Sequence, residues 1–97
     1  MKPYAPLPHI TIGSMRIPVV VNPALEDHGR YVELPETRIE VSHEGHDTIY
    51  ETILHESLHA IDTMYALNLG ERRVRVLENV LAALIAHNPK LVKGLRR

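Results

Sequence analysis

Residues 52–62 read TILHESLHAID, and this stretch predicts an amphipathic helix over about residues 48–66. At about 100° per residue, the apolar side chains share one broad arc of the helix. The arc contains Ile53, Leu54, Leu58, Ala60, Ile61, Met64 and Tyr65. His55, His59 and Asp62 cluster outside that arc, and Glu56 lies off their other side. The helix is therefore expected to pack one face against a core and to present the histidines at the boundary of that core.

Two histidines four residues apart carry the chemistry of this helix. Because positions i and i+4 lie on one helical face, the imidazoles of His55 and His59 can reach a single metal ion. Glu56 then projects beside the metal, where its carboxylate can accept a proton from metal-bound water. With 7 histidines in 97 residues, chance alone would produce the pattern in roughly one such chain in twenty. An incidental pair of histidines in a protein without metal therefore stays an alternative.

The composition bounds the kind of protein and the kind of site. A chain of 97 residues, 44% of them hydrophobic, is expected to form one domain that spans residues 1–97. Its 11 basic and 12 acidic residues give no global attraction to nucleic acid. No stretch is typical of a membrane span or a signal peptide, so a cytoplasmic protein without membrane contact is expected. Because cysteine is absent, any transition-metal site must be built from histidine and carboxylate.

Short β-branched segments precede the helix and predict strands at residues 10–12, 16–21, 31–34 and 37–41. The last two segments alternate apolar and polar side chains, as half-buried strands do. Gly13-Ser14 and Pro35-Glu36 supply a turn signal within each pair of segments. We expect a small twisted, mainly antiparallel sheet that packs against the helices.

A second helix is predicted over about residues 71–87. Its apolar stripe contains Val74, Leu77, Leu81, Leu84 and Ile85. Gly70 is expected to adopt a left-handed conformation before this helix, and Asn88-Pro89 to stop it. Because the connection is short, the two helices should be antiparallel neighbours. The expected fold class is α+β, with the sheet followed by two antiparallel helices.

A catalytic zinc ion needs three protein ligands, of which His55 and His59 would supply two. The metzincin continuation H-E-x-x-H-x-x-G-x-x-H fails, because Asp62 and Tyr65 stand where it requires glycine and histidine. Asp62, one helical turn beyond His59, is expected to orient a histidine rather than to bind the metal. The third ligand should therefore come from the second helix.

Glu71 and Glu78 are the two candidates for the third ligand. In an antiparallel hairpin folded about residues 68–69, Glu78 faces His59, whereas Glu71 faces Ala66, about 10 Å further along. Glu78 also lies at the margin of the apolar stripe, where an unpaired carboxylate is costly. We therefore expect Glu78 to be the ligand. Glu71 remains the alternative, although its place at the start of a helix also suits the helix dipole.

These features resemble a known group of metalloenzymes. With His55-Glu56-x-x-His59 on one helix and Glu78 on the next, the chain resembles the gluzincin branch of the zincin metallopeptidases. Residues 52–62 are similar to small H-E-x-x-H proteins encoded by bacteriophages and prophages. The resemblance implies a minimal zincin-like domain with one zinc ion on His55, His59 and Glu78, and with Glu56 as the general base of peptide-bond hydrolysis. It also implies a peptide or protein substrate held along an edge strand, for which residues 37–42 are the candidate, and a place in the host cytoplasm.

One role in that mechanism has several candidates. His43, His46, Tyr50 and Tyr65 are the available donors for stabilising the oxyanion. The main alternative function is a non-catalytic zinc-binding module that acts through a protein partner. The intact Glu56 argues against this alternative, because a structural zinc site needs no base.

Overall fold

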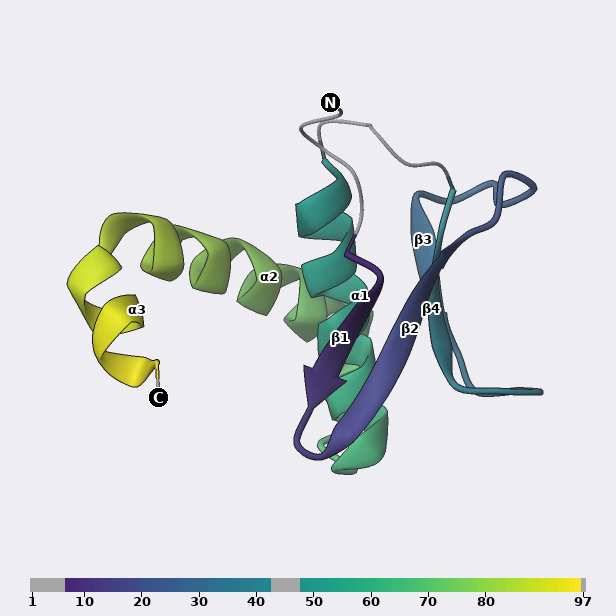
Figure 1. Ribbon diagram of the computed structural model, residues 1–97, viewed down its shortest axis with the longest axis horizontal. Coiled ribbons are helices and arrows are strands. Elements are labelled where there is room, and N and C mark those ends of the chain that lie inside the picture. Colours follow the sequence, from purple (N-terminus) through teal and green to yellow (C-terminus); the bar gives the residue numbers. More distant parts are fainter. Residues whose placement is uncertain (1–6, 43–47, 97) are drawn as a thin grey trace.

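The computed structural model of the protein describes residues 7–42 and 48–96, in which four strands precede three helices (Figure 1). The strands are β1 (His9–Ile12), β2 (Met15–Val21), β3 (Gly29–Val32) and β4 (Arg38–Val41). The helices are α1 (Ile49–Met64), α2 (Gly70–His87) and α3 (Pro89–Leu95). The predicted α+β class and the order of sheet before helices are confirmed.

The strands form one mixed sheet in the order β1-β2-β4-β3. The pairs β1–β2 and β3–β4 are antiparallel, whereas β2 and β4 are parallel, with Val19 beside Ile39. The sheet is thus mainly antiparallel, as expected. The strand expected at the edge, residues 37–42, instead forms the interior strand β4, which is paired on both sides. The free edges belong to β1 and β3, and of these two strands β3 makes the more extensive contact with α1.

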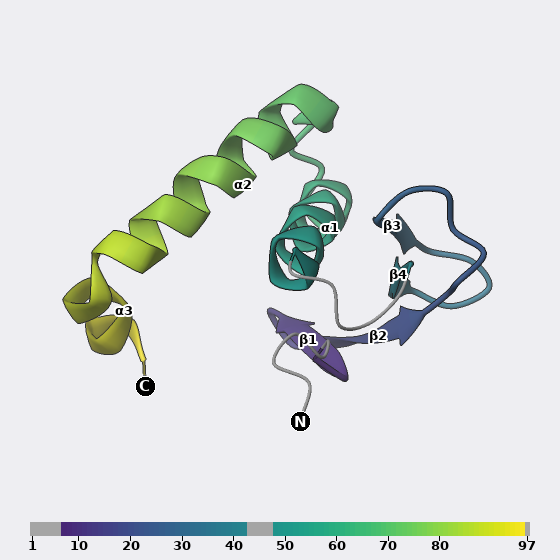
Figure 2. The ribbon, with the colours of Figure 1, turned by 90° about the horizontal axis from the view of Figure 1, so that it is seen from above.

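One face of the sheet and one face of α1 enclose the core (Figure 2). Successive side chains of a strand point to opposite faces, so Ile17 and Val19 on β2 face α1 together, as do Ile39 and Val41 on β4. The helix contributes Ile49, Ile53 and Ala60, which helical periodicity brings to one side. The amphipathic pattern read from residues 52–62 therefore predicted the buried face of α1. Tyr65, expected in that arc, is 56% exposed.

The expectation that the two helices are antiparallel neighbours is wrong. Figures 1 and 2 both show α2 crossing α1 near the N-terminal end of α2 and then leading away from the sheet and α1. Val74 is the one buried residue of α2, whereas Val80 and Ile85 are more than half exposed. We call α2 and α3, residues 70–96, the helical arm, and the sheet with α1 the body. No described helix is long and apolar enough to cross a membrane.

The connection between α1 and α2 explains the crossing. Ala66 and Asn68 have positive φ angles of 53° and 58°, and Gly70 has the expected left-handed conformation with a φ of 79°. The backbone N–H groups of Leu69 and Gly70 donate to the two carboxylate oxygens of Asp62, at 2.9 and 3.3 Å. These three left-handed residues turn the chain sharply, and Asp62 holds the start of α2 against the last turns of α1. The first turn of α2 therefore lies over the histidines.

Candidate metal centre

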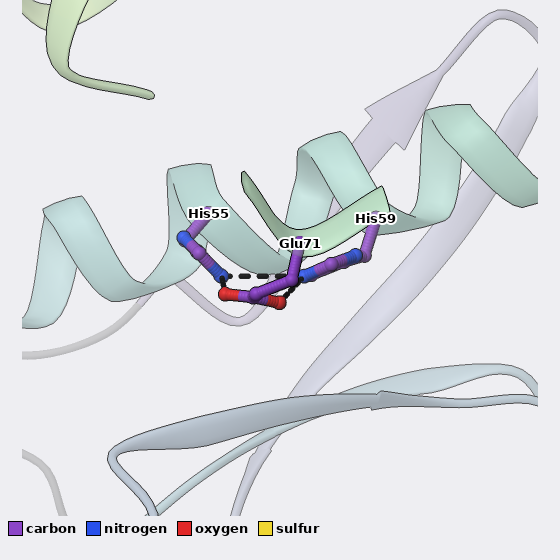
Figure 3. A group of neighbouring side chains, drawn as sticks. All are labelled: His55, His59 and Glu71. Atoms are coloured by element: carbon purple, nitrogen blue, oxygen red, sulfur yellow. Dashed lines mark hydrogen bonds and ion pairs between the residues drawn. The ribbon is translucent and has the colours of Figure 1, made fainter. Parts of the chain in front are cut away.

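The two histidines of α1 converge as their spacing predicted. The Nε2 atoms of His55 and His59 lie 3.2 Å apart, and their ring centroids are 4.9 Å apart. Both side chains are only partly exposed, at 16% and 25%. Figure 3 shows the two rings pointing toward the same place below α1, where α2 begins. Two nitrogen ligands from one helix are thus available to a single ion.

Glu71, in the first turn of α2, completes this group (Figure 3). Its Oε1 lies 2.8 Å from His55 Nε2, and its Oε2 lies 2.7 Å from His59 Nε2. One ligand atom from each of the three residues falls within 4.8 Å of the others. Ligands about 2.0–2.1 Å from a tetrahedral zinc ion lie about 3.3 Å from each other. The three side chains fit such an ion after an expansion of a few tenths of an ångström.

Glu78 occupies a different position from the one that the sequence predicted. Its Oε1 lies 2.8 Å from Nδ1 of His55, the ring nitrogen that points away from His59 and Glu71. The prediction placed Glu78 opposite His59 because it assumed two antiparallel helices. Since α2 crosses α1 instead, Glu71 reaches both Nε2 atoms, and Glu78 is left beside the outer nitrogen of His55. The structure therefore brings the alternative, Glu71, into the ligand group, and gives Glu78 the position of a histidine-orienting carboxylate.

Asp62 was expected to orient a histidine, and its contacts lie elsewhere. Its carboxylate accepts hydrogen bonds from the backbone of Leu69 and Gly70, and its own carbonyl accepts one from Leu67 at 3.1 Å. Asp62 thus acts on the site through the backbone, because it fixes the position from which Glu71 extends. No feature of its sequence position distinguished this role from a contact with His59.

Glu56 lies beside the histidines in a poorly solvated position. It is 8% exposed, and this burial raises its pKa above the ordinary value, against the opposing electrostatic influence of His55 and His59. The backbone N–H of Tyr31 on β3 donates to its carboxylate. A Cβ on Gly29 would stand 2.7 Å from Thr52 Cγ2 and 3.5 Å from Glu56 Cγ. The absence of a side chain at Gly29 therefore allows β3 to approach α1 closely enough to hold Glu56 from its backbone.

The histidines and β3 border one cleft of about 730 Å³. Ser42 donates its backbone N–H to the carbonyl of His28 at 2.8 Å. His28 and Ser42 are therefore a hydrogen-bonded pair, and such pairs alternate with non-hydrogen-bonded pairs along an antiparallel ladder. Gly29 and Tyr31 belong to the non-hydrogen-bonded pairs, so their backbone N–H and C=O groups face away from β4. That outer edge lines the cleft together with α1 and the start of α2. Among the described lining residues are Gly29, Arg30, Tyr31, His55, Glu56, His59, Glu71 and Arg75.

The candidates for an oxyanion donor are only partly placed by the structure. His43 and His46 lie outside the described residues. Tyr65 caps the C-terminal end of α1, and its hydroxyl reaches the turn between β1 and β2, 3.0 Å from the position of a Cβ on Gly13. The described lining of the cleft includes neither Tyr50 nor Tyr65, but it does include Tyr31 and Arg75. Sequence reasoning missed these two, because a tyrosine on a strand and an arginine on a helix carry no signal of a shared cleft.

Burial, followed by the nearby charge of Glu33, raises the pKa of Tyr31 above its ordinary value. The phenol therefore keeps its proton at neutral pH and remains a hydrogen-bond donor. Arg75 Nη2 lies 3.4 Å from Glu71 Oε1. Burial alone would raise the pKa of Glu71, but the hydrogen bonds and charge of His59 and His55 outweigh it, so this pKa lies below the ordinary value. Glu71 is thus held as a carboxylate, the form that binds metal.

A comparison of the chain with protein-family models, with curated proteins and with solved structures finds no match. The geometry of His55, His59, Glu71 and Glu56 is therefore the basis on which a function is proposed.

Proposed function

We propose that the protein is a zinc-dependent metallopeptidase, with zinc held by His55, His59 and Glu71. The single observation that carries this proposal is the meeting of two histidine Nε2 atoms and one carboxylate within 4.8 Å, beside a glutamate that is 8% exposed. Two imidazoles and one carboxylate form a ligand set that catalytic zinc uses. A purely structural zinc site is usually closed by four protein ligands and needs no base. The buried Glu56 therefore favours catalysis over a non-catalytic zinc-binding module.

The chain's own residues supply the proton transfers of the proposed reaction. When bound, zinc would supply Lewis acidity, which lowers the pKa of a water molecule and polarises a carbonyl group. Glu56 would accept a proton from the attacking water and deliver it to the leaving amine, and its poorly solvated position suits a carboxylate that must be protonated and deprotonated in turn. Tyr31 and Arg75, two donors among the described residues that line the cleft, would stabilise the negative charge on the carbonyl oxygen.

We propose a peptide as the substrate because of the edge strand beside the site. The outward-facing backbone groups of Gly29 and Tyr31 lie along the cleft. An extended peptide could add to this edge by backbone hydrogen bonds. The Tyr31 N–H donates to Glu56 in the present arrangement, so a bound peptide would have to share or replace that hydrogen bond. The proposed peptide-binding edge is thus β3 rather than residues 37–42, the candidate named from the sequence.

Metal analysis and peptide cleavage test the proposal together. Protein purified without a histidine tag should contain about one zinc ion per chain and cleave members of a mixed peptide library. Glu56→Gln should retain the zinc and lose cleavage, and His55→Ala should lose both. Glu51→Gln is the matched control, since Glu51 is an exposed glutamate in the first turn of the same helix.

Each result separates the competing functions. Zinc without cleavage, in wild type and Glu56→Gln alike, would support the non-catalytic zinc-binding module. Unchanged zinc content in a His55→Ala, His59→Ala double variant would contradict the proposed site altogether.

A further inference from the structure

The helical arm leaves an apolar surface without a partner in the described part of the chain. Val76 and Val80 on α2 are 55% and 57% exposed, and Leu95 on α3 is 68% exposed. The exposed large apolar residues of the arm are Val76, Val80, Leu84, Ile85, Leu91 and Leu95. An apolar surface of this kind commonly marks a site of protein association.

Charge is divided unequally between the arm and the body. The segment 70–97 holds 7 of the 11 lysines and arginines and 2 of the 12 acidic residues, which leaves 4 basic and 10 acidic residues for the segment 1–69. The net charge is therefore +5 on the arm segment and −6 on the rest of the chain. The six described cations of the arm, Arg72, Arg73, Arg75, Lys90, Lys93 and Arg96, are all exposed. Among described residues, their one ion pair is the contact of Arg75 with Glu71.

Among the described residues, the exposed acidic groups of the body lie mainly at the connections that flank β3. Glu26 and Asp27 precede β3, and Glu33 and Glu36 follow it. Leu34, between the last two, is 80% exposed. The two connections lie at opposite ends of β3 (Figure 1). We call the connection after β3, residues 33–36, the acidic end of the body; it pairs apolar and acidic groups, whereas the arm pairs apolar and basic groups. The two surfaces are complementary in charge and alike in apolar character.

The fold keeps the two surfaces of one chain apart. In both views the arm leads away from α1 on one side, and β3 and β4 lie on the opposite side (Figures 1 and 2). An arm in this position does not cover the acidic end of its own body. A second copy of the chain provides one acidic end for the arm of the first copy and one arm for its acidic end.

We propose that the protein forms a homodimer in which the arm of each copy packs on the acidic end of the other copy's body. Reciprocal exchange makes two identical contacts and closes the assembly with two-fold symmetry. Direct packing of one arm on the other would instead bring two positively charged surfaces together, which electrostatics opposes. Glu71 lies at the start of the arm. A dimer that fixes the arm would therefore also hold the Glu71 carboxylate over His55 and His59 of the same chain.

Sedimentation of the full chain over a wide range of concentration tests the dimer. We expect a reversible monomer–dimer equilibrium that weakens as salt is added, because exposed charges are screened. Val80→Glu should weaken the dimer by about tenfold or more. Asn79→Glu introduces the same charge at the next residue, which is exposed outside the apolar stripe, and should leave the equilibrium within about twofold. Circular dichroism and zinc content show whether each variant keeps its fold.

Charge reversal distinguishes the proposed dimer from other arrangements. Glu33→Lys with Glu36→Lys, and separately Lys90→Glu with Lys93→Glu, should each weaken the dimer several-fold at low salt, and all four together should restore it. If the arm variant strengthened the dimer, the arms would pack on each other and the proposal would be overturned. A chain that stays monomeric at every concentration would also overturn it, and co-sedimentation of that monomer with anionic vesicles would assign the arm to a membrane surface.

Discussion

Nδ1 of His55 lies 2.8 Å from Oε1 of Glu78, while Nε2 of the same ring faces His59 and Glu71. A carboxylate can only accept a hydrogen bond, so Nδ1 must carry a proton. If zinc replaced the contact of Nε2 with Glu71, the neutral ring with its proton on Nδ1 would present the Nε2 lone pair to the metal. A second carboxylate that orients a ligating histidine in this way is a common feature of zinc sites. In the proposed zinc site, Glu78 would therefore orient His55 rather than bind the metal.

Replacement of Glu78 by alanine should lower zinc affinity by about 10–100-fold without changing the stoichiometry of about one ion per chain. The loss arises because the His55 ring is no longer fixed in the orientation that presents Nε2. A competition titration with a zinc chelator measures the affinity. If Glu78→Ala failed to bind zinc at any concentration while Glu71→Ala bound normally, Glu78 would be the ligand after all.

Replacement of Glu71 by alanine should lower zinc affinity further than Glu78→Ala does, because it removes one of three proposed ligands rather than an orienting group. The same titration provides the measurement. Arg75→Ala is a useful control, since Arg75 contacts Glu71 at 3.4 Å but carries no ligand atom for zinc. We expect Arg75→Ala to bind zinc within severalfold of wild type, as an exposed ion pair contributes little.

The sequence allowed prediction of every element with a strong period, because such elements depend on local patterns. Residues 52–62 predicted the face of α1 that packs on the sheet, and the spacing of His55 and His59 predicted that their rings converge. The third ligand depended instead on how two helices cross. That crossing depends on left-handed conformations at Ala66 and Asn68. This region is uncommon for alanine, and although asparagine adopts it more often, no local pattern marks Asn68 as left-handed. The way in which α1 and α2 pack, unlike the period of their apolar residues, could not be derived from a single sequence.

The same limit applies to the sheet. The strands β3 and β4 were predicted from their alternation, yet their order was not, because β4 returns to pair with β2 across a long connection. The free edge beside the site is therefore β3, a strand of four residues that begins with Gly29. Only the packing of β3 against α1 shows why glycine stands there.

Gly29→Ala should destabilise the protein by about 1–3 kcal/mol, because the new methyl group would overpack the contact between β3 and α1. The added Cβ would stand 2.7 Å from Thr52 Cγ2 and 2.9 Å from the carbonyl oxygen of Glu40, and a backbone atom cannot easily move aside. Urea unfolding followed by circular dichroism gives the free energy. Gly94→Ala is the control, since a Cβ on this residue of α3 meets no atom within 4 Å, and it should be neutral or slightly stabilising. Equal stability of the two variants would show that β3 does not lie this close to α1.

Glu40 should make the free energy of unfolding depend on pH in the acidic range. Its carboxylate accepts hydrogen bonds from Asn22, Arg38 and Arg30 at 3.0, 2.7 and 2.8 Å. Together these donors hold its pKa at about 2, below the usual 4.5. The unfolded chain therefore binds more protons than the folded chain between these two values, and stability rises with pH there. The contribution of Glu40 is complete above about pH 4.5 and is lost as the pH falls toward 2.

Glu40→Gln tests this dependence, because the amide cannot ionise. At neutral pH the variant should be less stable than wild type by about 1–3 kcal/mol, the range for hydrogen bonds to a charged group. The difference should shrink as the pH is lowered from 4.5 toward 2, since acid then neutralises Glu40 in the wild type. Urea unfolding at neutral pH and at several acidic values measures both effects, and Glu26→Gln, at an exposed glutamate of the β2–β3 connection, controls for the loss of one negative charge. A difference that stayed constant down to pH 2 would mean that Glu40 is not held ionised by Asn22 and the two arginines.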